Sequence, residues 1–301
     1  MLRITCLFIL LLIFYGCEKE LSASGNNYLS LNDFFNKNQI PSQLFTVNAI
    51  NGGAFKSNNG AVLHVMANSF VDQAGQSVTG TLEIQFKEIY EAYDMILNNK
   101  VTMSDGLPLV SGGEFYIDAT LQGKELRLAP GKILEIDLPP SAVNLDQMQV
   151  FNGQTDNMGN INWKPNPDPN NTVARRDSGM TLNYNIYFDT ATQFWLNCDQ
   201  FEIPPFASYT VMPGNCPDID STMVFVDFTG KNAAVTMYRG NNVFSNAHLM
   251  ADQATIIALC YKNNRFYSSF ITTTLADNQS STLNFSETTE AEFKNRIKAL
   301  K

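Results

Sequence analysis

The chain has 301 residues, with 20 Lys and Arg, 29 Asp and Glu, a formal net charge of −9, and 44% hydrophobic residues. This length favours two domains and provides enough apolar surface for a core that needs neither metal nor disulfide. The shortage of basic residues excludes a large phosphate-binding surface, so no nucleic-acid partner is expected.

The first sixteen residues have the pattern of a secretory signal. Arg3 provides a short positive region, and an uninterrupted apolar run follows over residues 7–15. A membrane-spanning helix needs ~20 apolar residues, whereas the central region of a cleavable signal is shorter. Residues 1–16 are therefore predicted to be a signal peptide.

A cysteine follows the apolar run directly. Gly16-Cys17 resembles the lipobox of bacterial lipoproteins in the looser form found in Bacteroidota, in which the cysteine becomes the lipidated first residue. The resemblance implies an acyl anchor such as palmitate on Cys17, a flexible tether over residues 17–29, and attachment to the outer membrane on its periplasmic or external face. An ordinary signal peptide with an incidental cysteine is the alternative.

A first β-sandwich domain is predicted over residues 30–163. Ser30 is a suitable helix N-cap, and the short helix after it is expected to end near Pro41. Apolar and polar residues then alternate, most clearly over 81–87 and 132–138. This period of two indicates strands with one buried face.

A Pro/Asn-rich linker is predicted over residues 164–178. Its three prolines, at positions 165, 167 and 169, disfavour a sheet interior and favour an extended spacer. A second β-sandwich domain is predicted over residues 179–301. Its strand candidates include 223–228, 233–238, 255–261 and 266–271.

The end of the chain has the pattern of an amphipathic helix. Thr289 and Glu292 form a capping box, and Phe293, Ile297 and Leu300 recur on one helical face. One apolar stripe implies that this helix docks on a sheet. The predicted fold is therefore all-β, with two sandwiches in tandem, a short N-terminal helix and a docked C-terminal helix.

Three segments resemble known β domains. Residues 60–84 are similar to the opening of a ZU5-like β-sandwich, with a small-residue/Phe step at 69–70 and a Val-x-Gly strand entry at 78–80. Residues 111–117 and the Trp-x-Asn-Cys-Asp motif at 195–199 resemble domains of Bacteroidota lipoproteins. The resemblance implies an interaction module. Self-cleavage, which some ZU5 domains perform at a His-Phe-Ser step, is not implied because the chain lacks that step.

Three cysteines besides Cys17 follow the signal. Cys198 and Cys216 are expected near strand ends or loops, whereas Cys260 lies in the apolar run 256–260. In an oxidising compartment this favours a disulfide between Cys198 and Cys216, with Cys260 as a buried thiol. Two unpaired cysteines are the alternative. The chain has no Cys-x-x-Cys and only two histidines, so no metal or cofactor is expected.

Neither histidine belongs to a known catalytic motif. His64 is predicted to be a solvent-facing strand residue, and His248 a loop residue. The segments 156–160 and 218–220 carry oxygen atoms that could bind calcium. Turn formation explains both segments more simply.

One group of acids suits carbohydrate chemistry. Glu88, Glu91 and Asp94 recur at a spacing of three, which would place them on one side of a helical turn beside Tyr90 and Tyr93. Carboxylates with neighbouring aromatic rings are the groups that sugar binding or glycoside cleavage uses. Solvated acids on a connecting segment are the simpler interpretation.

The function predicted from these features is that of a non-catalytic binding or structural module, anchored by lipid in the cell envelope. The expected partners are the membrane, through the N-terminal lipid, and an envelope protein or a glycan. A carbohydrate-binding or carbohydrate-cleaving envelope protein is the alternative.

Overall fold

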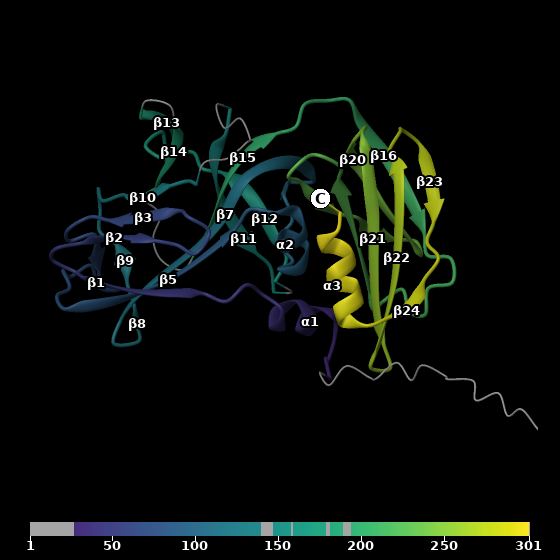
Figure 1. The fold of residues 1–301 in the computed structure, drawn as a ribbon, viewed down its shortest axis with the longest axis horizontal. Coiled ribbons are helices and arrows are strands. Elements are labelled where there is room, and N and C mark those ends of the chain that lie inside the picture. The colour runs from purple at the N-terminus through teal and green to yellow at the C-terminus, as the bar shows by residue number, and fades with distance from the viewer. Residues whose placement is uncertain (1–26, 140–146, 158, 179–180, 189–193, 301) are drawn as a thin grey trace, which may run out of the picture.

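The computed structural model describes residues 27–139, 147–157, 159–178, 181–188 and 194–300. Two β-rich lobes lie side by side, and three helices lie where the lobes meet (Figure 1). The predicted all-β class, with a short N-terminal helix and a C-terminal helix, is confirmed.

The first lobe is a sandwich of two main sheets. The larger sheet has the order β1 (Gln43–Asn48), β5 (Thr81–Ile89), β7 (Leu107–Leu121), β15 (Phe194–Phe201), β11 (Gln149–Thr155) and β12 (Ile161–Pro165), with β6 (Met103–Ser104) and β8 (Lys124–Glu125) paired to β7. The second sheet has the order β13 (Thr172–Ser178), β14 (Thr181–Phe188), β10 (Leu134–Asp137), β3 (Val62–Val65) and β2 (Gly53–Lys56). A small pair, β4 (Phe70–Val71) and β9 (Arg127–Leu128), completes the lobe.

The alternation in the sequence shows which side of β5 is buried. Leu82, Ile84 and Phe86 are fully buried, and they contact the side chains of the facing sheet in one apolar cluster. Thr81 and Glu83, which point to the other side of the strand, are exposed. Each buried side chain of this size contributes about 1.5–3 kcal/mol relative to exposure, so the pattern fixes the register of the strand.

The linker predicted over 164–178 is not a boundary between the lobes. After it, β13 and β14 join the sheet of β10, and β15 inserts between β7 and β11. Pro165 is the last residue of β12, which lies at the edge of its sheet, so its missing N–H leaves no ladder bond broken inside the sheet. The strands of the second lobe all follow Phe201.

The second lobe is also a sandwich of two sheets. One has the order β19 (Tyr238–Gly240), β20 (Val243–Met250), β16 (Phe206–Met212) and β23 (Gln279–Thr282). The other has the order β18 (Ala234–Thr236), β17 (Thr222–Phe228), β21 (Gln253–Lys262), β22 (Arg265–Thr274) and β24 (Ser286–Thr288). Residues 254–261 of β21 are buried without alternation, as expected for a central strand that is covered on both faces.

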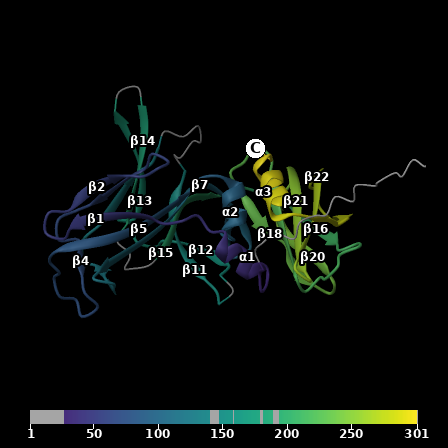
Figure 2. The same cartoon turned by 60° about the horizontal axis from the view of Figure 1, so that its bottom comes forward.

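Three helices, α1 (Leu31–Lys37), α2 (Ala92–Leu97) and α3 (Glu290–Lys298), contribute to the apolar cluster of the second lobe. Figure 2 shows them beside β18, β21 and β22, between the two lobes. The predicted caps are confirmed, since the Ser30 hydroxyl accepts from Asp33 and Thr289 forms the capping box with Glu292. In α3, Phe293 and Ile297 are buried, as their spacing predicts.

The N-terminal helix packs with the second lobe, although the sequence placed it in the first. The ring of Phe34 lies 5.1 Å from that of Phe266 and 6.4 Å from that of Phe293, and Phe35 lies 5.7 Å from Phe225. These edge-on arrangements are those that aromatic pairs prefer. Helix α1 therefore shares one core with β17, β22 and α3.

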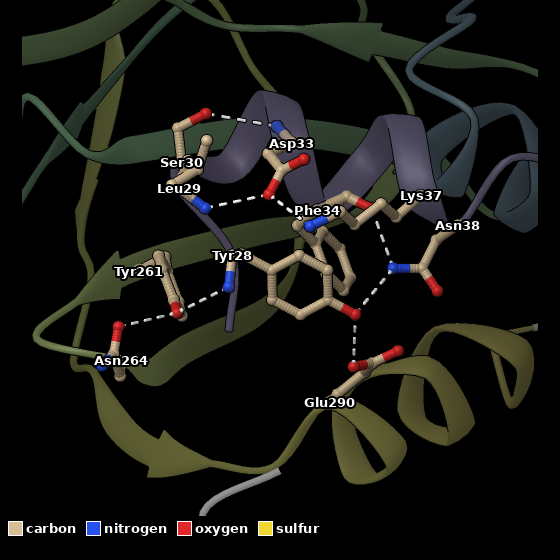
Figure 3. A network of polar contacts seen from close by, with 10 residues as sticks. All are labelled: Tyr28, Leu29, Ser30, Asp33, Phe34, Lys37, Asn38, Tyr261, Asn264 and Glu290. Carbon is tan, nitrogen blue, oxygen red and sulfur yellow. Dashed lines mark hydrogen bonds and ion pairs between the residues drawn. The ribbon is translucent and has the colours of Figure 1, made fainter. Parts of the chain in front are cut away.

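Polar contacts reinforce this docking around Tyr28 (Figure 3). The Tyr28 backbone N–H donates to the Tyr261 hydroxyl at 3.1 Å, and the Tyr28 hydroxyl donates to the Glu290 carboxylate at 2.7 Å. The Asn38 side-chain amide donates to the same hydroxyl at 3.3 Å. Tyr28 is thus attached to β21, to α3 and to the end of α1.

We predict that Phe34→Ala destabilises the protein by ~3–5 kcal/mol, because it removes a fully buried ring from the aromatic cluster. Denaturant unfolding followed by circular dichroism measures the change. Leu29→Ala is the matched control, because Leu29 is 93% exposed and precedes the same helix. Equal stability of the two variants would contradict the docking of α1.

Candidate functional site

A groove of about 640 Å³ lies where the two lobes meet. Its first-lobe side comes from the segment before β6 and from the β11–β12 hairpin, and its second-lobe side comes from β17, β18 and β19. Polar side chains contribute amide, carboxylate, hydroxyl and guanidinium groups, namely Asn99, Asp105, Gln154, Asp156, Asn160, Asn162, Thr236, Tyr238 and Arg239. The apolar lining consists of Val101, Met103, Ile161, Met223 and Met237.

The segment 99–103 forms one wall of this groove and joins the lobes. Thr102 donates its backbone N–H to the Ala234 carbonyl at 2.7 Å, and its hydroxyl exchanges hydrogen bonds with the same residue at 3.0 Å. The Trp163 indole N–H donates to the Val101 carbonyl at 3.0 Å. These groups are buried, so breaking any of the bonds would leave a donor or acceptor without a partner, at a cost in free energy. This penalty keeps the segment 99–103 in place.

On the first-lobe rim, Asp105 is fixed by two side chains of β12. Its backbone N–H donates to the Asn162 side-chain oxygen at 2.8 Å, and its carboxylate accepts from the Asn162 amide at 3.0 Å. Lys164 forms an ion pair with the same carboxylate. Hydrogen bonds from Lys164 and Asn162 lower the pKa of Asp105, so this carboxylate is ionised and accepts hydrogen bonds.

The segment 156–160, a possible calcium loop by composition, is the turn between β11 and β12. The Asp156 carboxylate accepts from the Asn160 backbone N–H at 2.9 Å and from its side-chain amide at 2.8 Å. Asn99 donates to the Asn160 side-chain oxygen at 2.9 Å. The turn therefore presents its amide and carboxylate groups at the groove in a fixed arrangement.

On the second-lobe rim, Tyr238 and Arg239 of β19 extend beside the groove. Tyr238 is 53% exposed, which is unusual for a tyrosine, and Arg239 forms an ion pair with Asp220. Partial burial, and then the negative charge of Asp105 across the groove, raise the pKa of Tyr238. A ligand in the groove would therefore contact both lobes together.

Of the three acids predicted to share one helical turn, two do so: Glu91 is the N-cap of α2, and its carbonyl accepts from the Asp94 backbone N–H at 2.9 Å. Glu88 belongs to β5 and is buried, where its carboxylate accepts from Ser57 at 2.8 Å, Asn59 at 2.9 Å and Tyr90 at 3.1 Å. Asp94 lies in α2, beyond the end of the strand. The strand continues through Ile89, so the spacing of three does not correspond to a helical period at Glu88, and the prediction is wrong for this residue.

The two histidines have different environments from those predicted. His64 in β3 is half-buried, and its Nε2 lies 2.8 Å from the Asp137 carboxylate of β10. Glu135 lies opposite His64 in the ladder, and the three groups could together bind a cation. The pair itself is a cross-strand contact between an imidazole and a carboxylate. His248 is exposed, and it lies in β20 rather than in a loop.

The predicted disulfide between Cys198 and Cys216 does not form. Cys198 lies within β15 and is fully buried in the first-lobe core, whereas Cys216 lies in the loop before β17 and packs against the second-lobe core. Leu196 and Cys198 lie on the face of β15 that packs in the core. Their polar neighbours Asn197 and Asp199 make this strand hard to recognise in the sequence. All three cysteines of the described chain are free thiols, and the thiol nearest to Cys216 is that of Cys260.

A polar network that composition did not reveal connects β7 and β15 inside the first lobe. Glu114 of β7 and Asp199 of β15 are fully buried, and the Asn197 amide donates to the Asp199 carboxylate. Ser111 donates to the Asn197 side-chain oxygen at 2.9 Å. Both carboxylate oxygens of Glu114 have no hydrogen-bond partner among the described residues. Burial, and then the charge of Asp199, raise the pKa of Glu114 well above its usual range.

We predict that this burial makes the protein less stable as the pH rises. The folded state keeps the Glu114 proton to higher pH than the unfolded state, so between the unfolded pKa of about 4 and the raised folded pKa the unfolded state binds fewer protons, and the free energy of unfolding falls with pH. Glu114→Gln cannot ionise and should flatten the decline between about pH 5 and 8. Urea unfolding at several pH values measures it.

The matched control for this prediction is Glu83→Gln, because Glu83 is an exposed residue of β5 in the same sheet. This variant should keep the pH dependence of the wild type. Parallel pH profiles for the wild type and Glu114→Gln would show that Glu114 does not carry the effect.

Comparison of the chain with family models, with curated proteins and with solved structures finds no match. Among the described residues, no helix combines the length and the apolarity that crossing a membrane requires. The functional conclusion therefore depends on the geometry of the groove and on the sequence pattern around Cys17.

Proposed function

We propose that this chain is a non-catalytic, lipid-anchored envelope protein that binds a carbohydrate in the groove between its lobes. The observation that carries the proposal is the composition of the groove. Fixed amide, carboxylate and guanidinium groups surround an apolar lining, and an exposed tyrosine stands at the rim. The volume lies in the range of small-molecule sites.

The chemistry of the groove suits a sugar better than an ion or an apolar ligand. A sugar ring has hydroxyl groups that both donate and accept, together with a C–H face that packs on an aromatic ring. Asn99, Asn160 and Asn162 can both donate and accept, and Asp105 accepts. Tyr238 offers an exposed ring. Because these polar groups already hold one another in place, little ordering is needed when a ligand binds.

The protonation of the rim favours binding over glycoside cleavage. A glycosidase needs one carboxylic acid that stays protonated near neutral pH, which requires a raised pKa. Asp105 has a lowered pKa because Lys164 and Asn162 bind its carboxylate. Glu114 and Asp199 have raised pKa values but are fully buried away from the groove lining. We therefore assign Asp105 to hydrogen bonding with the ligand.

The anchor would hold the second lobe near the membrane. Cys17 lies outside the described residues, and Tyr28 follows it by eleven positions. A fully extended chain spans at most ~3.6 Å per residue, so Tyr28 would lie no more than about 40 Å from the lipid. Because Tyr28 is bonded to Tyr261 and Glu290, the distance from the membrane to the second lobe is limited in the same way.

We predict that Tyr238→Ala and Asn162→Ala each weaken binding to a glycan by about tenfold, since loss of one ring contact or one hydrogen bond costs about 1–1.5 kcal/mol. Glycan-array screening of the chain without its signal identifies the ligand, and calorimetry then gives the affinities. Leu44→Ala is the control, because Leu44 is 71% exposed and does not line the groove. Unchanged affinities in both groove variants would refute this site.

We predict that Cys17→Ala abolishes incorporation of a fatty-acid analogue and releases the protein from the membrane fraction. The reason is that the thiol is the atom that carries the lipid in the proposed anchor. Metabolic labelling followed by detergent partitioning measures both effects. Cys6→Ala, within the signal, is the control and should leave labelling intact. Labelling that persists in Cys17→Ala would exclude this anchor.

A further inference from the structure

Two cysteines that the sequence did not connect lie against the same turn of the second lobe. Cys260 of β21 is the ladder partner of Thr222 in β17, and its thiol donates to the Asp218 carbonyl at 3.4 Å. Cys216 lies in the loop between β16 and β17, and its sulfur is 3.1 Å from the Thr222 hydroxyl. Thr222 donates to the same Asp218 carbonyl at 2.5 Å. The two sulfurs are thus connected through the Thr222 hydroxyl and the Asp218 carbonyl.

We propose that Cys216 and Cys260 form a disulfide when the chain meets an oxidising environment. Cys260 is held by the central strand of its sheet, whereas Cys216 is half-buried in a loop between two strands. The loop is the element that can adjust to the narrow geometry of a disulfide, while the strand stays in place. The arrangement described above is then the reduced form.

The environment of the two sulfurs sets the order of the reaction. A hydrogen bond from the Cys260 thiol lowers the pKa of Cys216 to about 6, and the same contact, with burial, raises the pKa of Cys260. At neutral pH Cys216 is therefore largely a thiolate and is the more accessible sulfur, which makes it the nucleophile. Cys260 is the thiol that reacts second.

The electron and proton balance follows thiol–disulfide exchange. The Cys216 thiolate attacks a disulfide oxidant, which gives a mixed disulfide and expels one oxidant thiolate. Cys260 loses its proton and attacks the Cys216 sulfur, which forms the new S–S bond and expels the second oxidant thiolate. Two protein thiols are oxidised, and one oxidant disulfide is reduced to two thiols.

The disulfide would fix a loop that reaches the rim of the groove. The loop also carries Asp220, which forms the ion pair with Arg239 at the rim. The 43 residues between the two cysteines contain β17 to β20 and most of β21. Closing a loop of this length restricts the unfolded chain, so oxidation should raise the melting temperature by on the order of 10 °C.

The test uses the full chain without its signal, incubated with reduced or oxidised glutathione. Free thiols are alkylated, and peptides are then analysed by mass spectrometry. We expect a peptide that links Cys216 to Cys260 in the oxidised sample, free Cys198, and a higher melting temperature that reductant reverses. Cys216→Ser should lose both the link and the shift, and Cys198→Ser should keep both.

Full alkylation of Cys216 and Cys260 after oxidation, or a link to Cys198, would overturn the proposal. The same alkylation on cells trapped with acid distinguishes this failure from failure of the proposed function. A link that forms with glutathione in vitro but not in cells would place the chain in a reducing compartment. That result would count against the envelope location while leaving the disulfide geometry intact.

Discussion

The structure depends on the contact that holds the two sandwiches together, because the groove exists only while the lobes keep their relative position. Backbone and side-chain hydrogen bonds connect Thr102 to Ala234, and Ser111 to Asn232. Such bonds contribute only about 1 kcal/mol each when formed, and their main effect is to penalise any shift that would break them. The larger free energy comes from α1, α2 and α3, whose apolar faces are buried in the second-lobe core beside this contact.

The order of the groove also depends on α1, near the N-terminus, because this helix packs in the second-lobe core beside the contact between the lobes. Phe34 and Phe35, together with four residues between 96 and 103, complete a core whose strand residues come mainly from the C-terminal third of the chain. The chain then leaves this core, builds the first sandwich, and returns. A lipid anchor at Cys17 would therefore restrain the second lobe directly, and the first lobe only through it. The groove would stay open, and the short tether would limit its distance from the membrane.

The sequence predicts what depends on neighbouring residues and misses what depends on distant ones. Alternation along β5 and the caps at Ser30 and Thr289 are local patterns, and the structure confirms them. The predicted domain boundary is wrong because the prolines at 165–169 interrupt the strand pattern at a sheet edge, and the first lobe continues after them. Only the long-range pairing of β13, β14 and β15 shows that it continues. The groove was missed for the same reason, since its walls come from three separate segments of the chain, 99–106, 154–162 and 223–239.

The motifs at 111–117 and 195–199, on which the predicted resemblance rests, lie where the pairing of two strands is irregular. Residues 111–117 and 194–201 are adjacent stretches of β7 and β15, and the register between these strands shifts at Cys198 and Asp199. Gly113 has φ 143°, and a Cβ there would lie 2.9 Å from the Tyr90 ring, so only glycine fits at this irregular position.

An isolated buried carboxylate such as Glu114 destabilises the fold, and an apolar residue would pack there at lower cost. Polar groups that must find one another across two strands penalise every other register, so the hydrogen bonds from Ser111 to Asn197 and from Asn197 to Asp199 favour the observed pairing of β7 with β15.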